Sequence, residues 1–303
     1  MLRSLYSGIS GLRNHQIRMD SVGNNISNVN TVGYKSSRTN FIDAISQTIR
    51  SGSATTNPAQ LGTGINVGSV SNSFVQGSLQ STGRTLDLAI QGKGFFAVQA
   101  MDSTGTLTGS PLFSREGIFF LDQNNNLVNS NGYAVHGYLN TTLYNVAPPT
   151  SPSGQDQPAA QNTATGKIII NPTDFDLSSL SIDKNGYITA LAKAGGAADA
   201  NAGKTVFIGQ IALASFANQE GLEKKGQSLY GPGPASGAAV IASNNHTANG
   251  AKAEINSGYT EMSNVDLSEE FVNLITTQRG YQANARVITT SDTLLEELIQ
   301  LKR

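Results

Sequence analysis

Apolar residues recur at alternating spacings of three and four positions in the first segment of the chain, from Met1 to about Val29. This spacing predicts an amphipathic helix with a single apolar seam. The residues predicted to form the N-terminal seam are Leu5, Ile9, Leu12, Met19 and Ile26. Asn, Thr and Gly residues between Asn28 and Lys35 predict the end of this helix, because they favour turns over continued helical backbone.

The last segment, from about Leu267 to Arg303, repeats the same spacing. Asp266 followed by Glu269 is typical of a helix N-cap with its capping-box partner. The residues predicted to form the C-terminal seam are Phe271, Leu274, Tyr281, Ala285, Ile288, Leu295 and Ile299. Each helix needs an apolar partner, so we expect the two to pack together, within one chain or between copies. The alternative, in which each helix covers a sheet, stays open at this point.

Between the two ends the pattern changes to short apolar runs with period two, which is typical of β-strands. The runs are Leu86–Val98, Leu112–Leu121, Leu127–Tyr138, Lys167–Ile170, Leu180–Leu191 and Val206–Phe216. Asn131-Gly132 and Asn185-Gly186 predict hairpin turns. Strand and helix patterns do not alternate along the sequence, so we expect antiparallel pairing. The predicted fold class is α+β, with a discontinuous all-α terminal coiled-coil domain and a mainly antiparallel β domain.

The changes of pattern also predict domain boundaries. We expect residues 1–70 and 258–303 to form the helical terminal domain with an extended linker, and residues 71–257 to form the β-rich domain. Residues 141–165 are rich in Pro, Ser, Gln, Ala and Thr without periodicity, which predicts a loop or small insertion. The Gly/Ser/Thr-rich stretch Ser51–Gly77 is typical of an extended hairpin or a partly disordered segment. Phe41–Ile49 is compatible with a short helix before it.

Composition and charge narrow the classes of function. The net charge of −1 favours neither a nucleic-acid partner nor an anionic membrane. The absence of cysteine excludes disulfides and thiolate metal sites, and the three histidines lack metal-ligand spacing. No apolar run approaches the roughly 20 residues that span a bilayer, and the start does not read as a secretory signal. We therefore expect no enzyme, no cofactor or metal site and no membrane insertion.

The segment from Gly23 to Lys35 resembles a signature of the bacterial flagellar axial proteins, which build the rod, hook and hook–filament junction. The residues that carry this family motif are Asn24, Asn25, Asn28, Gly33 and Tyr34. Further blocks similar to the family are Ser81–Ile90, Phe113–Gly117 and Glu261–Arg303. Arg279-Gly280-Tyr281 and Leu301-Lys302-Arg303 are most similar to hook members of the family. Met1–Gly8 and Gln47–Arg50 are also similar to distal rod members.

This resemblance implies a structural subunit that polymerises into a helical tube with its terminal helices inside. It favours the extracellular flagellar hook, a flexible universal joint between rod and filament, with the distal rod of the basal body as the alternative. It implies self-association, contacts with rod, hook-cap, hook–filament junction and hook-length control proteins, and type III flagellar export without a cleaved signal peptide. The seam residues are then expected to carry assembly.

Overall fold

A computed structural model describes residues 2–53, 55–102, 104–139, 166–194, 202–242 and 253–301. The chain divides into two compact units. The first, here called the terminal unit, comprises Met1–Asn30, Lys35–Phe74 and Asn264–Arg303. The second, here called the β unit, comprises Thr31–Tyr34 and Val75–Ser263. The predicted loop at 141–165 lies outside the described residues.

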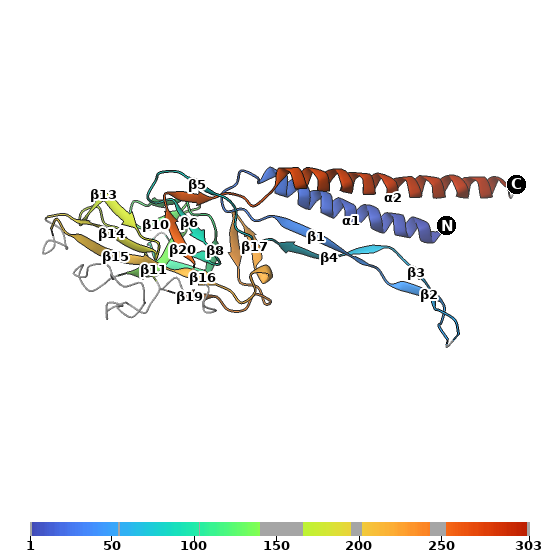
Figure 1. Cartoon of the computed structure of the whole chain (residues 1–303), viewed down its shortest axis with the longest axis horizontal. Helices are drawn as coiled ribbons and strands as arrows, with labels where there is room; N and C mark the ends of the chain where they lie inside the picture. The colour runs from blue at the N-terminus through green and yellow to red at the C-terminus, as the bar shows by residue number, and fades with distance from the viewer. Residues whose placement is uncertain are drawn as a thin grey trace. The chain divides into compact units, whose positions relative to one another are not determined.

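The terminal unit combines two helices and one long hairpin (Figure 1). Helix α1 (Leu2–Ser27) and helix α2 (Leu267–Leu301) lie side by side, as the apolar spacing predicted. The Asp266 side chain accepts from the backbone N–H of Ser268 at 2.8 Å, which confirms the predicted N-cap of α2. Strand β1 (Ser37–Asp43) pairs antiparallel with β4 (Ile65–Asn72), and β2 (Ser46–Arg50) pairs with β3 (Ala59–Gly62).

The short helix expected over Phe41–Ile49 is wrong, because this segment belongs to β1 and β2. Its exposure alternates in strand fashion, with Thr39 buried and Phe41 half-buried between the exposed Arg38, Asn40 and Ile42. Period two places Phe41 toward His15 of α1, with the ring centroids 5.6 Å apart. Tertiary packing on α1 thus decides the conformation that local sequence left ambiguous. Within the stretch Ser51–Gly77, strands β3 and β4 form the expected extended hairpin with β1 and β2.

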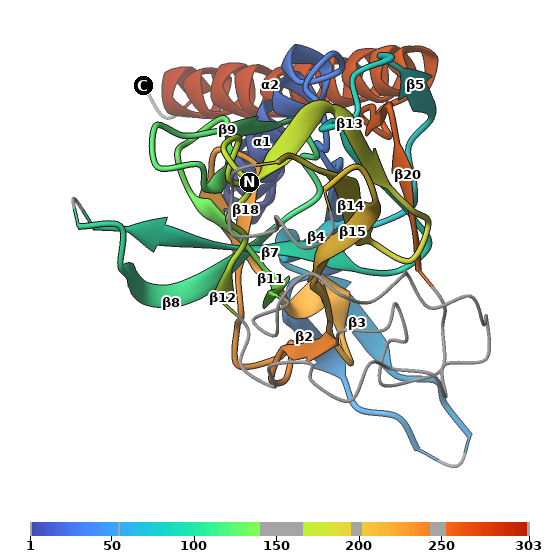
Figure 2. The same ribbon diagram turned by 90° about the vertical axis from the view of Figure 1, so that its left-hand side faces the viewer.

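The β unit is built from antiparallel strands and confirms the α+β fold class. Its largest sheet runs in the order β13-β14-β15-β11-β7-β8-β18-β17, and β13, β14 and β15 lie side by side in both views (Figures 1 and 2). The strands are β5 (Leu79–Ser81), β6 (Leu88–Gln91), β7 (Phe95–Met101), β8 (Leu107–Ser114), β9 (Phe119–Leu121), β10 (Leu127–Asn129), β11 (Ala134–Leu139), β12 (Gly166–Lys167), β13 (Phe175–Ile182), β14 (Tyr187–Ala192), β15 (Thr205–Ile211), β16 (Leu213–Ser215), β17 (Glu223–Gly226), β18 (Leu229–Gly231), β19 (Val240–Ala242), β20 (Glu254–Ser257) and β21 (Tyr259–Glu261).

Both predicted hairpin turns are confirmed in the β unit. Asn131-Gly132 joins β10 to β11, and Asn185-Gly186 joins β13 to β14. Gly132 and Gly186 have φ of 80° and 76°, the left-handed region that glycine adopts without steric cost. The core of this unit is aliphatic and aromatic, with Leu88, Phe96, Phe119, Ile168 and Ile188 among its fully buried side chains.

Candidate assembly interface

The two terminal helices contact each other along a line of small and polar residues. A β-carbon on Gly8 would lie 3.1 Å from Ile288 Cγ1, and one on Gly11 would lie 2.7 Å from the Asn284 side chain. Across the same line, a β-carbon on Gly280 would lie 2.7 Å from His15 Cε1. Side chains of each helix therefore fill the space above glycines of the other, and the backbones approach closely.

Hydrogen bonds follow the same contact line and fix its direction. The hydroxyls of Ser4 and Ser291 lie 3.3 Å apart near the chain termini. At the other end of the pair, Asn25 Nδ2 donates to Glu270 Oε1 at 2.9 Å. The first residues of α1 thus meet the last turns of α2, so the helices are antiparallel. Polar contacts of defined geometry set this register, whereas a purely apolar contact would tolerate sliding.

Most residues of the predicted seams lie beside this line instead of on it, and the exception is Ile288, which faces Gly8. Each seam residue of α1 follows a contact residue by one position, as in Ser4–Leu5, Gly11–Leu12, Arg18–Met19 and Asn25–Ile26. On α2 the same offset appears in Glu270–Phe271, Asn273–Leu274, Gly280–Tyr281 and Asn284–Ala285. One position turns a helix by about 100°. Because the helices are antiparallel, the same offset on each helix places both seams on one side of the pair.

The seams are only partly covered within the chain. The half-buried seam residues are Leu5, Leu12, Met19, Ile26, Leu274, Ala285, Ile288 and Leu295. The exposed seam residues are Ile9, Phe271, Tyr281 and Ile299. Among the seam residues of α1, Ile9 is the exposed one, at 45%. A second apolar stripe on α2 is also exposed, and it consists of Val272, Ile275, Val287, Leu294, Leu298 and Leu301. Exposed apolar residues gathered on one helix in this way are typical of interaction surfaces.

The first part of the family motif holds the terminal unit together. Asn25 is buried, its Oδ1 accepts from the backbone N–H of Ser37, and its Nδ2 donates to the carbonyl of Ser37, both at 2.9 Å. With its bond to Glu270, the Asn25 side chain joins α1, the start of β1 and the first turn of α2. Asn28 and Asn24 act locally, because Asn28 Nδ2 donates to Asn24 Oδ1 at 2.7 Å where the helix ends.

The second part of the motif belongs to the β unit. Gly33 has φ of 69°, its N–H donates to the carbonyl of Glu261 at 2.8 Å, and a β-carbon on it would lie 2.6 Å from the backbone nitrogen of Glu116. The ring of Tyr34 lies 4.9 Å from Lys224 Nζ. Only glycine fits at position 33, because both the backbone angle and the close approach exclude a side chain.

Glu261 also anchors a buried ion pair that sequence reasoning missed. Its carboxylate lies 3.2 Å from Arg115 Nη1 and accepts from the N–H of Gly77 at 3.0 Å. The two side chains are 0% and 2% exposed. Burial lowers the pKa of Arg115, and Glu261 opposes this effect. Both residues stand in blocks that resemble the family, but nothing in either block indicates the pairing.

Burial also shifts the pKa values of titratable groups in the contact between the helices. Burial, with a smaller contribution from Arg18, lowers the pKa of His15. Burial raises the pKa of Glu270, and the hydrogen bond from Asn25 works in the opposite direction. Over the described ranges, no group of three acidic or histidine side chains is arranged to hold a metal ion. Within the same ranges, neither helix is long and apolar enough to cross a membrane.

Comparison with known proteins identifies the family. The model "Flagella basal body rod protein" matches residues 5–35, "Flagellar hook protein FlgE/F/G D1 domain" matches 89–190, and "Flagellar basal body rod FlgEFG protein C-terminal" matches 256–301. The flagellar basal-body rod protein FlgG of Bacillus subtilis (strain 168) is 43% identical over 309 residues, covering 100% of both chains. The chain belongs to the flagellar rod and hook protein family.

Both branches of this flagellar family are represented among the relatives. In Borreliella burgdorferi, the rod protein FlgG and the hook protein FlgE are each 30% identical to this chain, with 100% coverage of both sequences. The alignments differ in length, however, with 310 positions for the rod protein and 453 for the hook protein. The flagellar family membership expected from the motif residues is confirmed, and its members are components of the basal body and hook.

Proposed function

We propose that this protein is a non-enzymatic subunit of the distal rod of the flagellar basal body, which polymerises into a straight tube. The full-length similarity to FlgG of Bacillus subtilis carries this proposal, since 43% identity extends over 309 aligned positions for a chain of 303 residues. The distal rod, the alternative in the sequence analysis, is therefore better supported than the hook. We place the protein in the periplasmic part of the basal body.

The hook remains the second candidate, because two hook proteins match the whole chain. The hook proteins of Borreliella burgdorferi and Treponema pallidum are 30% and 27% identical. Their alignments with this chain of 303 residues are 453 and 481 positions long, so the hook proteins contain additional sequence that this chain lacks. A subunit of this chain's length lacks room for that extra sequence, which favours the rod.

In the proposed polymer, the seams and the second apolar stripe of α2 are covered by neighbouring copies. The terminal units form the inner tube and the β units form the outer layer. Two different surfaces that meet head to tail, without closing a ring, generate a helical tube. The partners are other copies of this chain, the adjoining rod and hook segments with the cap, junction and length-control proteins, and the flagellar type III export apparatus.

In the proposed polymer, the hairpin of the terminal unit would make the tube stiff by contacting a neighbouring copy. Its exposed apolar residues are Ile42, Ile45, Ile49, Leu61 and Val70. Apolar residues in such number on a narrow hairpin indicate contact with a neighbour. A hairpin wedged between subunits would resist the sliding that bending requires, as expected for a rod.

Imaging of the assembled tube by electron microscopy tests the proposed function. Purified full-length protein, concentrated until it polymerises, should form straight tubes. Curved or supercoiled tubes would contradict the rod and support the hook. A protein that forms no ordered polymer at any concentration would contradict both.

A further inference from the structure

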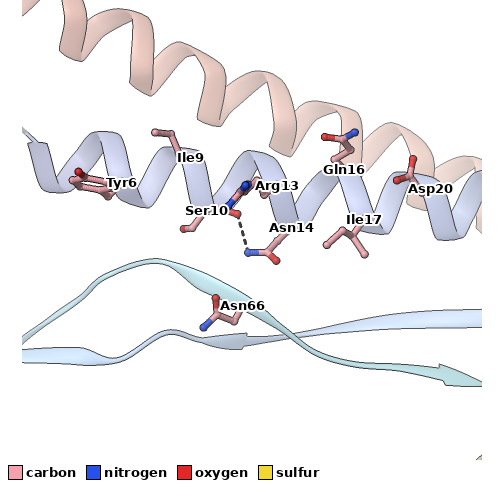
Figure 3. Close-up of a pocket in the computed structure, with 9 residues that line it drawn as sticks. All are labelled: Tyr6, Ile9, Ser10, Arg13, Asn14, Gln16, Ile17, Asp20 and Asn66. Atoms are coloured by element: carbon pink, nitrogen blue, oxygen red, sulfur yellow. Dashed lines mark hydrogen bonds between the residues drawn. The ribbon is translucent and has the colours of Figure 1, made fainter.

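A groove lies between α1 and β4 in the terminal unit (Figure 3). Its volume is about 650 Å³, and its lining includes Tyr6, Ile9, Arg13, Ile17 and Asn66. Tyr6, Ile9 and Ile17 are 71%, 45% and 44% exposed. In the described part of the chain, Arg13 makes neither a hydrogen bond nor an ion pair. The groove therefore combines three exposed apolar side chains with the unpaired Arg13 cation, and its lining also includes the carboxylate of Asp20, two helical turns beyond Arg13.

The C-terminal end of α2 complements the groove, because it carries exposed apolar side chains beside an acidic one. Leu294, Leu298 and Leu301 recur at i, i+4 and i+7 and therefore share one face of the helix. They are 47%, 50% and 82% exposed. Glu297 borders the same face, since it lies three residues after Leu294, and it forms no ion pair within the described residues. Glu296 points to a different side, because it is rotated by about 100° from Glu297.

The α2 end cannot reach the groove of its own chain. The contact between Ser4 and Ser291 means that α2 runs on past the start of α1 (Figure 1). Residues 6–20 of α1 extend in the opposite direction from this point. As long as α2 remains one helix, Leu294–Leu301 can enter only the groove of a second copy.

We propose that the α1–β4 groove of one copy binds the α2 end of another, with Leu294, Leu298 and Leu301 on its apolar residues and Glu297 beside Arg13. An amphipathic helix commonly binds a groove through anchors at i, i+4 and i+7. The anchors span about 10 Å, and the groove from Tyr6 to Ile17 spans about 16 Å, at about 1.5 Å per residue. This inference rests on the proposed polymer and specifies one contact within it.

The contact joins two different surfaces, so it is heterologous. Each copy carries one groove and one helix end, and the same contact can therefore repeat from copy to copy without closing. The pair of Arg13 and Glu297 would select the axial register, because the apolar contacts of the three leucines by themselves tolerate sliding. Charge exchange between these two positions therefore tests the proposal.

The experiment measures self-association of the full-length protein by sedimentation velocity over a range of concentrations. Arg13→Glu and Glu297→Arg should each weaken association by about tenfold or more, since each places like charges in contact. The double variant R13E/E297R restores opposite charges and should return association to near the wild-type level. The matched control R13E/E296R should stay as weak as R13E alone. Circular dichroism should be the same for all variants, because the exchanged residues are exposed.

A second readout uses the absence of cysteine from the chain. One variant carries Ile9→Cys and the other carries Leu298→Cys. When the two are mixed and oxidised, they should form a disulfide-linked heterodimer. Ile9→Cys mixed with Thr289→Cys, on another side of α2, should not. The contact would be overturned if the wild type associates, R13E/E297R does not restore association, and the Ile9–Leu298 cross-link does not form. That result would leave the proposed polymer standing. A wild-type chain that stays monomeric throughout would overturn the proposed function together with the contact.

Discussion

A β-carbon on Gly11 of α1 would lie 2.7 Å from the side chain of Asn284 on α2. Such a distance is too short for two carbon atoms in ordinary contact, so the helix pair depends on glycine at this position. Asn284 is held in place, because its Nδ2 donates to the carbonyl of Gly280 at 3.0 Å. The two helices can therefore approach closely here because position 11 has no side chain and the Asn284 side chain occupies the space above it.

Gly11→Ala should destabilise the terminal unit relative to Gly23→Ala. Both changes gain about 1 kcal/mol of helix propensity, but only Gly11→Ala meets a neighbouring side chain. Nothing lies within 4 Å of a β-carbon on Gly23, which makes this residue a matched control. Thermal unfolding followed by helical circular dichroism should place Gly11→Ala about 1–3 kcal/mol below Gly23→Ala. Equal stability of the two variants would contradict the close approach.

Asn25→Ala should loosen the joint between α1, β1 and α2. The change leaves the backbone of Ser37 and the carboxylate of Glu270 without their bonds from Asn25, at a cost of about 1–3 kcal/mol. Asn24→Ala removes an exposed neighbour and should cost less than about 1 kcal/mol. Hydrogen exchange of the β1 amides should accelerate in Asn25→Ala alone. Unchanged exchange would argue against the joint.

Glu261→Gln should destabilise the β unit by about 3–5 kcal/mol, because it leaves the Arg115 cation buried without its counter-ion. The exposed pair of Lys225 and Glu223, 2.8 Å apart with side chains 51% and 52% exposed, provides the control. Glu223→Gln should change the free energy of unfolding by less than about 1 kcal/mol. Urea unfolding measures both variants. A small effect of Glu261→Gln would mean that the pair contributes little.

Acidification should weaken the terminal unit through His15. Its pKa lies below the ordinary value of 6.5, so the unfolded chain binds the proton more readily than the folded one. The stabilisation is complete above pH 6.5 and is lost as the pH falls below that value. Glu270 works in the opposite direction at lower pH, because its raised pKa favours the protonated folded form.

Melting temperatures between about pH 7.5 and 5.5 should therefore fall more steeply for the wild type than for His15→Gln. His136 in the β unit also has its pKa lowered by burial, and it contributes equally to both chains. The difference between the two slopes thus isolates His15. Identical slopes would show that the pKa of His15 does not differ between the folded and unfolded chain.

Much of the architecture was predictable from periodicity. The predicted helix boundaries fall within about two residues of the observed ones, and glycine turn signals located two hairpins correctly. The contact line between the helices was not predictable, because Gly8, Gly11, His15 and Asn284 do not belong to a hydrophobic pattern. Apolar spacing instead revealed the neighbouring face, one position away. Arg115 and Glu261 lie 146 positions apart, and no local rule pairs them.

The central claim is that the exposed seam is an assembly surface, and Phe271→Asp tests it most directly. Phe271 is 49% exposed in the single chain, so the variant should keep its helical circular dichroism and its melting temperature. Ser268→Asp, exposed one turn earlier, serves as the control. Sedimentation velocity at polymerising concentrations should show that the wild type and Ser268→Asp associate while Phe271→Asp stays monomeric. Association of Phe271→Asp at the wild-type level would contradict the claim.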